Sequence, residues 1–263
     1  MTKKPLIVLT NDDGIKSPGL RAAARAVMSL GELLIVAPRE QQSSTGRAFI
    51  GMGEAEPFRY ELEGKRIRAF AVPTSPAVTM RHAFLLLADR RPALVISGIN
   101  YGENIGNGVT ISGTIGAALE AANLGAPAIA MSVVAMPEFH LTHSEAISFS
   151  GAAHFARYFA KRIIARGLPH GVDVLNVNVP ENARCATEWR WTRVSRAAYY
   201  HSRVEETVNG KRFTGYETRL DEMDFESDSD VRAVILDRVV SVSPLTLDLT
   251  ARVSREERAR WNT

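Results

Sequence analysis

Two adjacent carboxylates, Asp12 and Asp13, are the first residues in the chain with an evident chemical use. They stand between Asn11 and Gly14, directly after a short apolar run. Two neighbouring carboxylates repel each other and any anion, whereas Mg²⁺, Mn²⁺ or Ca²⁺ removes that conflict, because these cations prefer oxygen ligands. The pair therefore predicts a site for one divalent metal cation. The competing interpretation is a helix N-cap, with Pro18 in the first helical turn.

A second polar group, residues 41–46, follows the next apolar run along the chain. A hydroxyl from this group, such as that of Ser43, could bind a cation or donate to a phosphate. On composition alone, an ordinary turn explains the same residues equally well.

The third group is the most informative and covers residues 97–108 and 112–114. The side-chain carbonyl of Asn100 can ligate a hard cation without adding charge, and the many glycines let backbone N–H groups approach phosphate oxygens. Ser112, Gly113 and Thr114 open a predicted helix, and a helix N-terminus binds anions through its free N–H groups and its dipole. The alternative is a long flexible loop.

The elements around these groups alternate between strands and helices, which predicts an α/β fold. Continuous apolar runs predict strands at Leu6–Thr10, Leu33–Ala37, Ala93–Ser97, Ala128–Val134 and Val174–Val179. Helices are predicted at Leu20–Leu30, Val78–Ala88, Gly113–Leu124 and Ser144–Ala165, and a hairpin at Arg59–Val72. Apolar strands of this kind indicate a Rossmann-like, mostly parallel sheet with helices on both faces. The three polar groups would then meet at the carboxyl edge, where such sheets bind ligands.

The character of the sequence changes after about residue 195, so we predict an α/β catalytic core at 1–195 and a C-terminal part at 196–263. Val204–Tyr216 predicts a β-hairpin extension, with Asn209-Gly210 at its turn. The hairpin has few apolar residues of its own, which favours an arm that packs on another subunit over a free surface hairpin. A loop at Asp221–Asp230 precedes the predicted return strands, which are Val231–Leu236, Val239–Val242 and Leu245–Leu247.

Composition excludes several classes of protein. The net charge is only +3, with no run of Lys or Arg, so no nucleic-acid polymer is expected as a partner. No stretch approaches the roughly 20 apolar residues of a membrane span, so no membrane partner is expected. The single cysteine, Cys185, fits a reducing compartment, and we expect a cytoplasmic protein.

Five stretches of the chain together resemble the SurE (survival protein E) family. They are LTNDDGIKSPGL, IVAPREQQS, VISGINYGENIGNGVTISGTIGAALEAANLG, LNVNVP and VSVSPLT, and they extend from residue 9 to residue 246. The combination of NDDG with SGIN-x-G-x-N-x-G and SGT-x-GAA is highly specific.

The resemblance implies a metal-dependent phosphatase that removes phosphate from nucleoside 5′-monophosphates, a 5′-nucleotidase. It implies Asp12, Asp13, Ser43 and Asn100 as metal ligands, and the two aspartates as catalytic residues. It implies substrate-binding roles for Asn11, Asn104, Ser112, Gly113 and Thr114. It also implies a homodimer or homotetramer in which the C-terminal extension exchanges between subunits.

The chain departs from the family pattern at two places that matter for the site. The family's second loop has Ser followed by Gly, whereas Ser43 is followed here by Ser44, so either serine could be the ligand. The segment Ala71–Pro76 also differs, which leaves the base and sugar preference open. A phosphatase for sugar phosphates or another phosphomonoester is therefore one alternative, and a non-catalytic nucleotide-binding regulator is the other.

Overall fold

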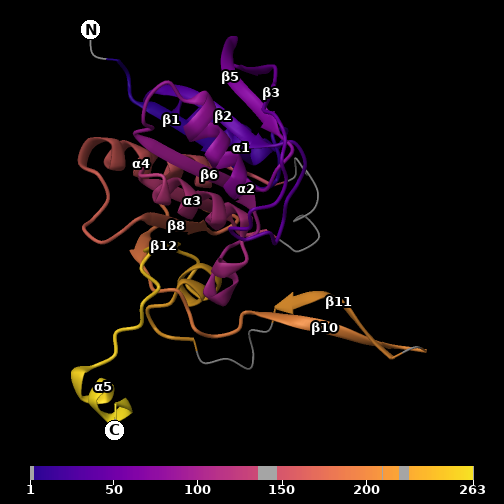
Figure 1. Cartoon of the computed structure of the whole chain (residues 1–263), viewed down its shortest axis with the longest axis vertical. Helices are drawn as coiled ribbons and strands as arrows, with labels where there is room; N and C mark the ends of the chain where they lie inside the picture. Colours follow the sequence, from indigo (N-terminus) through magenta and orange to yellow (C-terminus); the bar gives the residue numbers. More distant parts are fainter. Residues whose placement is uncertain (1–2, 136–146, 209, 219–224, 263) are drawn as a thin grey trace.

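A mixed β-sheet forms the centre of the computed structural model, which describes residues 3–135, 147–208, 210–218 and 225–262 (Figure 1). The strand order is β3-β5-β2-β1-β6-β7-β8-β12-β9, and β4 pairs with β5. The strands are β1 (Leu6–Thr10), β2 (Glu32–Pro38), β3 (Glu56–Pro57), β4 (Tyr60–Leu62), β5 (Lys65–Val72), β6 (Leu94–Tyr101), β7 (Ala128–Val133), β8 (Val174–Val179), β9 (Trp189–Trp191) and β12 (Val240–Leu245).

The six central strands from β5 to β8 run parallel. From β1 the chain first builds outward through β2 and β5, then returns to the other side of β1 and builds through β6, β7 and β8. The order therefore reverses between β1 and β6, and in open α/β sheets ligands bind beyond the carboxyl ends of the strands at such a point. Asp12 and Asp13 follow β1 directly, so they lie at this point.

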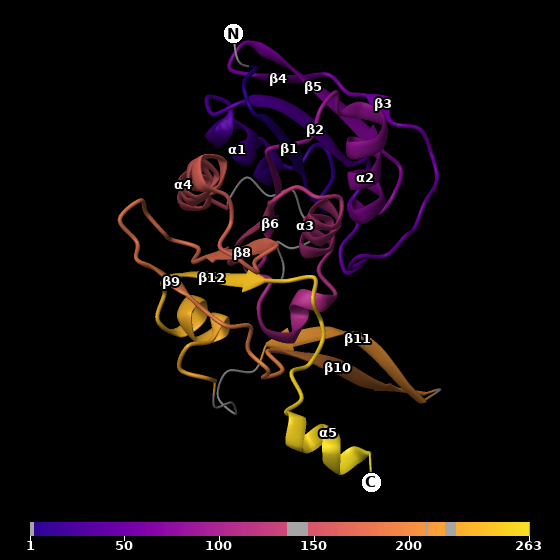
Figure 2. The same cartoon turned by 60° about the vertical axis from the view of Figure 1, so that its left-hand side comes forward.

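Helices cover both faces of the sheet, as Figure 2 shows. One face packs against α1 (Pro18–Val27) and α4 (Ser150–Arg166), and the other against α2 (Pro76–His82) and α3 (Gly113–Asn123). The inner strands are apolar on both faces and form two separate buried cores, one under each pair of helices. The predicted fold class, a mostly parallel α/β sheet with helices on both faces and a hairpin extension, is confirmed.

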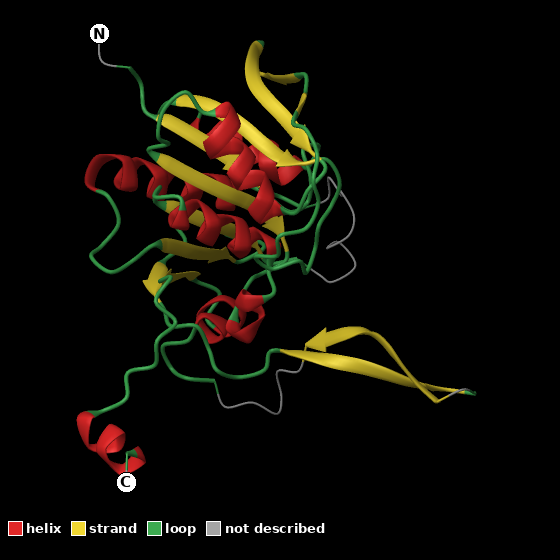
Figure 3. Cartoon of the chain, in the orientation of Figure 1, coloured by secondary structure: helices red, strands yellow, loops and turns green. Residues whose placement is uncertain are grey.

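The hairpin extends away from the body of the molecule in Figure 3. It consists of β10 (Tyr200–Thr207) and β11 (Gly210–Thr218), which form a sheet of their own. The last helix, α5 (Arg255–Trp261), has no buried residue. Between hairpin and helix the chain returns to the main sheet as β12, which pairs antiparallel with β8.

Several predicted elements differ from the structure. Leu245–Leu247 is not a separate strand, because β12 runs without a break to Leu245 and residues 246–247 lie outside the sheet. Val231–Leu236 is not a strand: Arg232–Leu236 forms a π-helical turn, because the capped turn at Ser229 starts a helix there. α2 ends at His82 and a π-helical turn follows at Ala83–Leu87. The long helix begins at Ser150 and not at the predicted residue 144. Residues 144–146 lie outside the described residues.

Another difference concerns the site. The strand predicted to stop at Ser97 continues as β6 to Tyr101, so Asn100 belongs to a strand and not to a loop. The pairing register with β7 shifts between Ser97 and Asn100, and the Gly98–Ile99 peptide bond is cis. The predicted strand ended too early because the next residues include glycine and asparagine, which are both depleted in strands.

Gly19→Ala is expected to destabilise the fold. A Cβ at Gly19 would lie 1.9 Å from the carbonyl oxygen of Ile99, so α1 would have to move away from β6. Overpacking of this kind costs about 1–3 kcal/mol, and thermal unfolding should therefore shift down by several degrees. Ala22→Ser, at a half-buried position of the same helix, is the control and should leave the midpoint nearly unchanged. A Gly19→Ala variant as stable as the control would contradict this packing.

No helix in the described parts of the chain combines the length and the apolar character needed to cross a membrane.

Candidate metal and phosphate site

The two aspartates lie at a tight turn after β1 and are almost completely buried, Asp12 with 5 % and Asp13 with 1 % exposure. Gly14 makes this turn with a φ of 94°, a region that disfavours other residues. The neighbouring loop after β2 is fixed on the turn, because the Gln42 amide donates to the Asp12 carbonyl at 2.7 Å. Backbone contacts therefore bring the first and second predicted polar groups together.

The N-terminus of α3 contacts Asp12. The Thr114 hydroxyl donates to Asp12 Oδ1 at 2.5 Å, and the Thr114 backbone N–H also donates to this carboxylate. A Cβ on Gly113 would lie 2.8 Å from both Asp12 Cβ and Asp12 Oδ2, so only glycine fits there without displacing the carboxylate. Thr114, predicted to face phosphate, thus orients Asp12 in this structure.

Asp13 has contacts from two other segments. Gln41 Nε2 lies 3.4 Å from Asp13 Oδ1, a long hydrogen bond, and 3.1 Å from Ser43 Oγ. The backbone N–H of Tyr101, at the end of β6, also donates to the Asp13 carboxylate. The Gln41 contact connects Ser43 to the aspartates. Ser43 and Ser44 are both exposed, and Ser44 has a φ of 61°.

Burial gives the two carboxylates unusual acidities. Desolvation raises the pKa of Asp12, with the hydrogen bonds from Thr114 acting in the opposite direction. Desolvation and the adjacent Asp12 charge raise the pKa of Asp13 well above its usual range. A buried pair of like charges is therefore costly in this site, and a bound cation would relieve the cost.

Asn100 and Asn104 are positioned by different partners. Asn100 Nδ2 donates to the Gly102 carbonyl at 2.8 Å. Asn104 is held by its neighbours on β7 and β8: its backbone N–H donates to Asn178 Oδ1 at 2.7 Å and its Nδ2 to Ser132 Oγ at 2.8 Å. Asn100 directly precedes Tyr101, whose backbone amide contacts Asp13.

The two remaining predicted residues show contrasting surroundings. Ser112 is the N-cap of α3, and its hydroxyl accepts from the Ile115 amide at 3.2 Å. Asn11 Nδ2 donates to the Gly14 carbonyl at 3.0 Å and so stabilises the turn. The buried Asn11 Oδ1 has no hydrogen-bond partner among the described residues, which leaves an oxygen acceptor beside the aspartates.

The donor set suits a hard divalent cation. Asp12 and Asp13 supply carboxylate oxygens, Ser43 a hydroxyl and Asn100 an amide carbonyl, and all of these are oxygen ligands. Asp12 forms no ion pair with any described side chain. No cluster of three His, Cys, Asp or Glu side chains occurs within the described ranges, so a cation here would depend on the neutral oxygens beside the two carboxylates.

Three residues around the site were not assigned a role from the sequence. Gln41 links Asp13 to Ser43, and Asn176 and Asn178 on β8 hold Asn104. Asn176 and Asn178 alternate with apolar residues in a fully buried strand. Two asparagines on one face of a buried strand could have indicated a polar function, because an unpaired amide is costly in a core.

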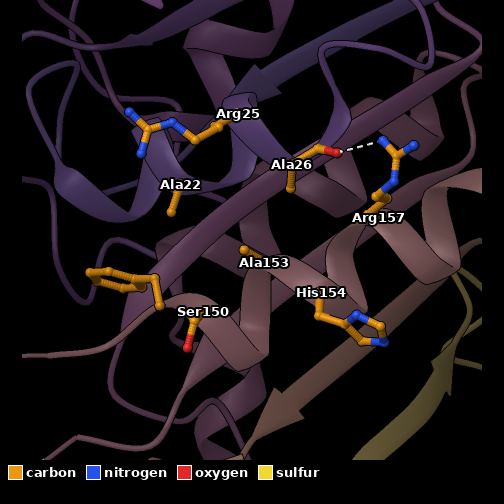
Figure 4. Close-up of a pocket in the computed structure, with 8 residues that line it drawn as sticks. Ala22, Arg25, Ala26, Ser150, Ala153, His154 and Arg157 are labelled. Carbon is orange, nitrogen blue, oxygen red and sulfur yellow. Dashed lines mark hydrogen bonds between the residues drawn. The ribbon is translucent and has the colours of Figure 1, made fainter. Parts of the chain in front are cut away.

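A separate hollow of about 480 Å³ lies between α1 and α4 (Figure 4). Its walls come from Ala22, Arg25, Ala26, Phe149, Ser150, Ala153, His154 and Arg157. Arg157 donates to the Ala26 carbonyl at 2.9 Å across it. None of the predicted site residues lines this hollow, so it is distinct from the aspartate site.

Fold and site together define a doubly wound α/β protein with a buried acidic, oxygen-rich site at its topological switch point. Known proteins of this kind match the chain closely. The profile of the family described as Survival protein SurE matches residues 7–201. The chain therefore belongs to the SurE family.

Individual relatives match over nearly the full length. The chain is 41 % identical to a 5′-nucleotidase SurE of Thermococcus gammatolerans, covering 95 % of this chain and 93 % of the relative. It is 43 % identical to a 5′-nucleotidase SurE of Methanothrix thermoacetophila, with 94 % of each chain covered. The crystal structure of the SurE protein from Aquifex aeolicus superposes with a TM-score of 0.76 at 29 % identity, covering 98 % of this chain and 100 % of that one.

Proposed function

We propose that this protein is a metal-dependent 5′-nucleotidase that hydrolyses the phosphate ester of nucleoside 5′-monophosphates. The observation that carries the proposal is the buried pair Asp12 and Asp13, held against the N-terminus of α3 at the switch point of the sheet. Relatives named 5′-nucleotidase SurE support the substrate class.

One divalent cation (Mg²⁺, Mn²⁺ or Ca²⁺) would be held by Asp12, Asp13, Ser43 and Asn100. When bound, the cation supplies positive charge to the phosphoryl oxygens and lowers the pKa of a water molecule. Thr114 holds Asp12 in one orientation, and Gln41 and Tyr101 do the same for Asp13. One of the two aspartates acts as the nucleophile or as the base for the attacking water.

The phosphate lies, in this proposal, between the start of α3 and the segment that carries Asn104. Ser112, Gly113 and Thr114 stand at the N-terminus of α3, where backbone N–H groups lack partners within the helix and the helix dipole adds partial positive charge. Preorganised donors of this kind stabilise charge that develops on the equatorial oxygens during in-line displacement. Asn104 and Asn11 provide side-chain amides for the remaining phosphate or sugar oxygens.

The assembly is part of the proposal. The projecting hairpin exposes Val204, Val208 and Phe213, which are 52 %, 102 % and 65 % exposed. Apolar side chains on a two-stranded arm gain little by facing water. We propose that residues 196–263 join subunits into a homodimer or homotetramer. Light scattering after gel filtration tests this, and a monomer at micromolar concentration would contradict it.

A substrate panel tests the activity. Purified protein is treated with a chelator and then assayed for phosphate release from nucleoside monophosphates, sugar phosphates and polyphosphate, with Mg²⁺, Mn²⁺ or Ca²⁺ or with no metal. The proposal expects turnover of nucleoside 5′-monophosphates that is lost with the metal and restored by it. Preference for a sugar phosphate would support the other phosphatase, and metal-dependent binding without phosphate release would support a regulator.

Thr114→Val is expected to slow hydrolysis of the best panel substrate by about 10- to 100-fold, because a buried carboxylate loses its hydroxyl donor. Thr114→Ser keeps the hydroxyl and should remain within about threefold of the wild type. Steady-state kcat and KM at saturating metal measure both variants. Equal rates for the valine and serine variants would show that the 2.5 Å contact has no catalytic importance.

A further inference from the structure

Asp230 is a completely buried acid outside the site described above. It stands at the start of the π-helical turn Arg232–Leu236 and accepts hydrogen bonds from three backbone amides. Its Oδ1 accepts from Ser195 at 2.9 Å and from Val231 at 2.8 Å, and its Oδ2 accepts from Gly106 at 3.0 Å. These amides belong to separate segments, so one carboxylate joins the C-terminal part of the chain to the segment after β6.

Gly106 is two residues beyond Asn104, the residue proposed to bind phosphate. Asn104 is fixed on its other side by Asn178 and Ser132. The segment 104–106 therefore runs from amide anchors on the sheet to a carboxylate anchor on the C-terminal segment. Because this segment is only three residues long, a displacement of Gly106 would be transmitted to Asn104.

The surroundings of Gly106 restrict the backbone conformation of segment 104–106. Gly106 has a φ of 54°, and a Cβ there would lie 3.2 Å from the Ala197 carbonyl. On the same side, the Tyr200 hydroxyl donates to the Glu103 carbonyl at 2.9 Å. The C-terminal segment thus contacts the chain on both sides of Asn104 and not at one point.

We propose that Asp230 is a positioning residue for the phosphate subsite, acting through Gly106 on Asn104. This inference rests on the proposed function. In this proposal Asp230 does not touch the substrate. It fixes the Gly106 amide, and this keeps the Asn104 side chain in its hydrogen bond with Ser132. Within the described part of the chain, the Asp230 side chain is hydrogen-bonded to Gly106, Ser195 and Val231, and none of these belongs to the predicted metal set.

The role requires an ionised carboxylate. Three N–H donors need acceptor oxygens, and an Asn side chain at this position would turn its own NH₂ toward one of them. Burial raises the pKa of Asp230 to about 6, with the three amides opposing the shift. The charged or titratable groups around it are Glu226, which is hydrogen-bonded to Ser195, and Arg193, whose carbonyl accepts from the Asp230 amide. The Tyr199 hydroxyl donates to Oε1 of Glu103, which stands three residues before Gly106 in the chain.

Asp230→Asn tests the proposal, with Glu226→Gln as the matched control. Glu226 lies in the same hydrogen-bond network, through Ser195 Oγ at 2.6 Å and the Arg196 amide at 3.1 Å, but it has no bond to residues 104–106. In Asp230→Asn, KM for the panel substrate and Ki for inorganic phosphate should both rise about tenfold. The metal concentration for half-maximal activity and kcat should change less than about twofold. Glu226→Gln should match the wild type in all four constants.

Each outcome decides the matter. A fall in kcat with KM and phosphate Ki unchanged would assign Asp230 a general structural role and overturn the proposal. Unchanged constants would also overturn it. If wild-type protein hydrolyses no phosphomonoester, the proposed function itself fails, and phosphate binding measured by calorimetry then replaces Ki.

A measurement on the wild type covers the case in which Asp230→Asn does not fold. In amide NMR spectra recorded between pH 5 and pH 8, the Gly106 backbone amide should titrate with a midpoint near 6. The side-chain amide of Asn104 should follow with the same midpoint. An Asn104 signal that does not move with Gly106 would overturn the coupling.

Discussion

Asp12→Asn is expected to lower phosphomonoester hydrolysis at least about 10³-fold, because in the proposed function it removes a charged ligand from the cation and a carboxylate from the reaction centre. The fold should survive. Asp12 is buried with a raised pKa, so its negative charge costs stability at neutral pH, and the neutral amide removes that cost. The metal-free variant should therefore unfold at the same temperature as the wild type or higher.

Three measurements check this prediction: kcat with saturating metal, metal affinity by calorimetry, and the thermal midpoint without metal. Asp89→Asn is the control, since Asp89 is exposed and pairs with Lys3 and Arg90 at the surface. It should leave all three values unchanged. Wild-type turnover by Asp12→Asn would refute the assignment of this residue to the metal and to catalysis.

Gly113→Ala is expected to have the second largest effect, a loss of roughly 10²-fold in kcat, because misplacing a reacting group by about 1 Å costs this much. The added Cβ would lie 2.8 Å from Asp12 Oδ2 and 3.1 Å from the Gln42 carbonyl. Since Gln42 donates to the Asp12 carbonyl, the aspartate cannot move away without displacing the neighbouring loop. Alanine is otherwise the best residue for a helix, so α3 itself should not suffer.

The readout is kcat beside the thermal midpoint, with Gly171→Ala as the control. A Cβ on Gly171 meets no atom of the described residues within 4 Å, and the position is far from the site in sequence and fold. Its positive φ of 77° gives the control some local strain, which should lower stability slightly and leave kcat intact. Full activity in Gly113→Ala would show that the contact with Asp12 does not constrain the reaction.

The sequence was sufficient for the main architecture because the buried strands are nearly continuous apolar runs. Leu6–Thr10 and Val174–Val179 were predicted with the bounds that the structure shows. Predictions were wrong where local composition opposed the tertiary arrangement. Val231–Leu236 is β-branched and apolar, yet it forms a helical turn that packs with Ile105, Tyr199 and Phe225 in a third buried cluster.

The candidate site was likewise predicted from the sequence only in part. The types and spacing of Asp12, Asp13 and the helix start at Ser112 were enough to predict an oxygen-rich site at the carboxyl edge, because parallel strands bring their ends to one edge. The partners of these residues could not be predicted. Gln41, Tyr101 and Asp230 act through single amides or side-chain atoms whose positions depend on packing.

Thus the sequence alone determined which residues could carry charge and oxygen ligands, and on which strands they stand, because hydrophobic periodicity is a local property. The tertiary structure decided which atoms each of these residues contacts. It brought the hydroxyl of Thr114, a predicted phosphate-binding residue, into contact with Asp12, and it placed Asn100 within a strand. It also brought Asp230 to Gly106 across 124 residues of chain, a contact that only the folded packing of distant segments can create.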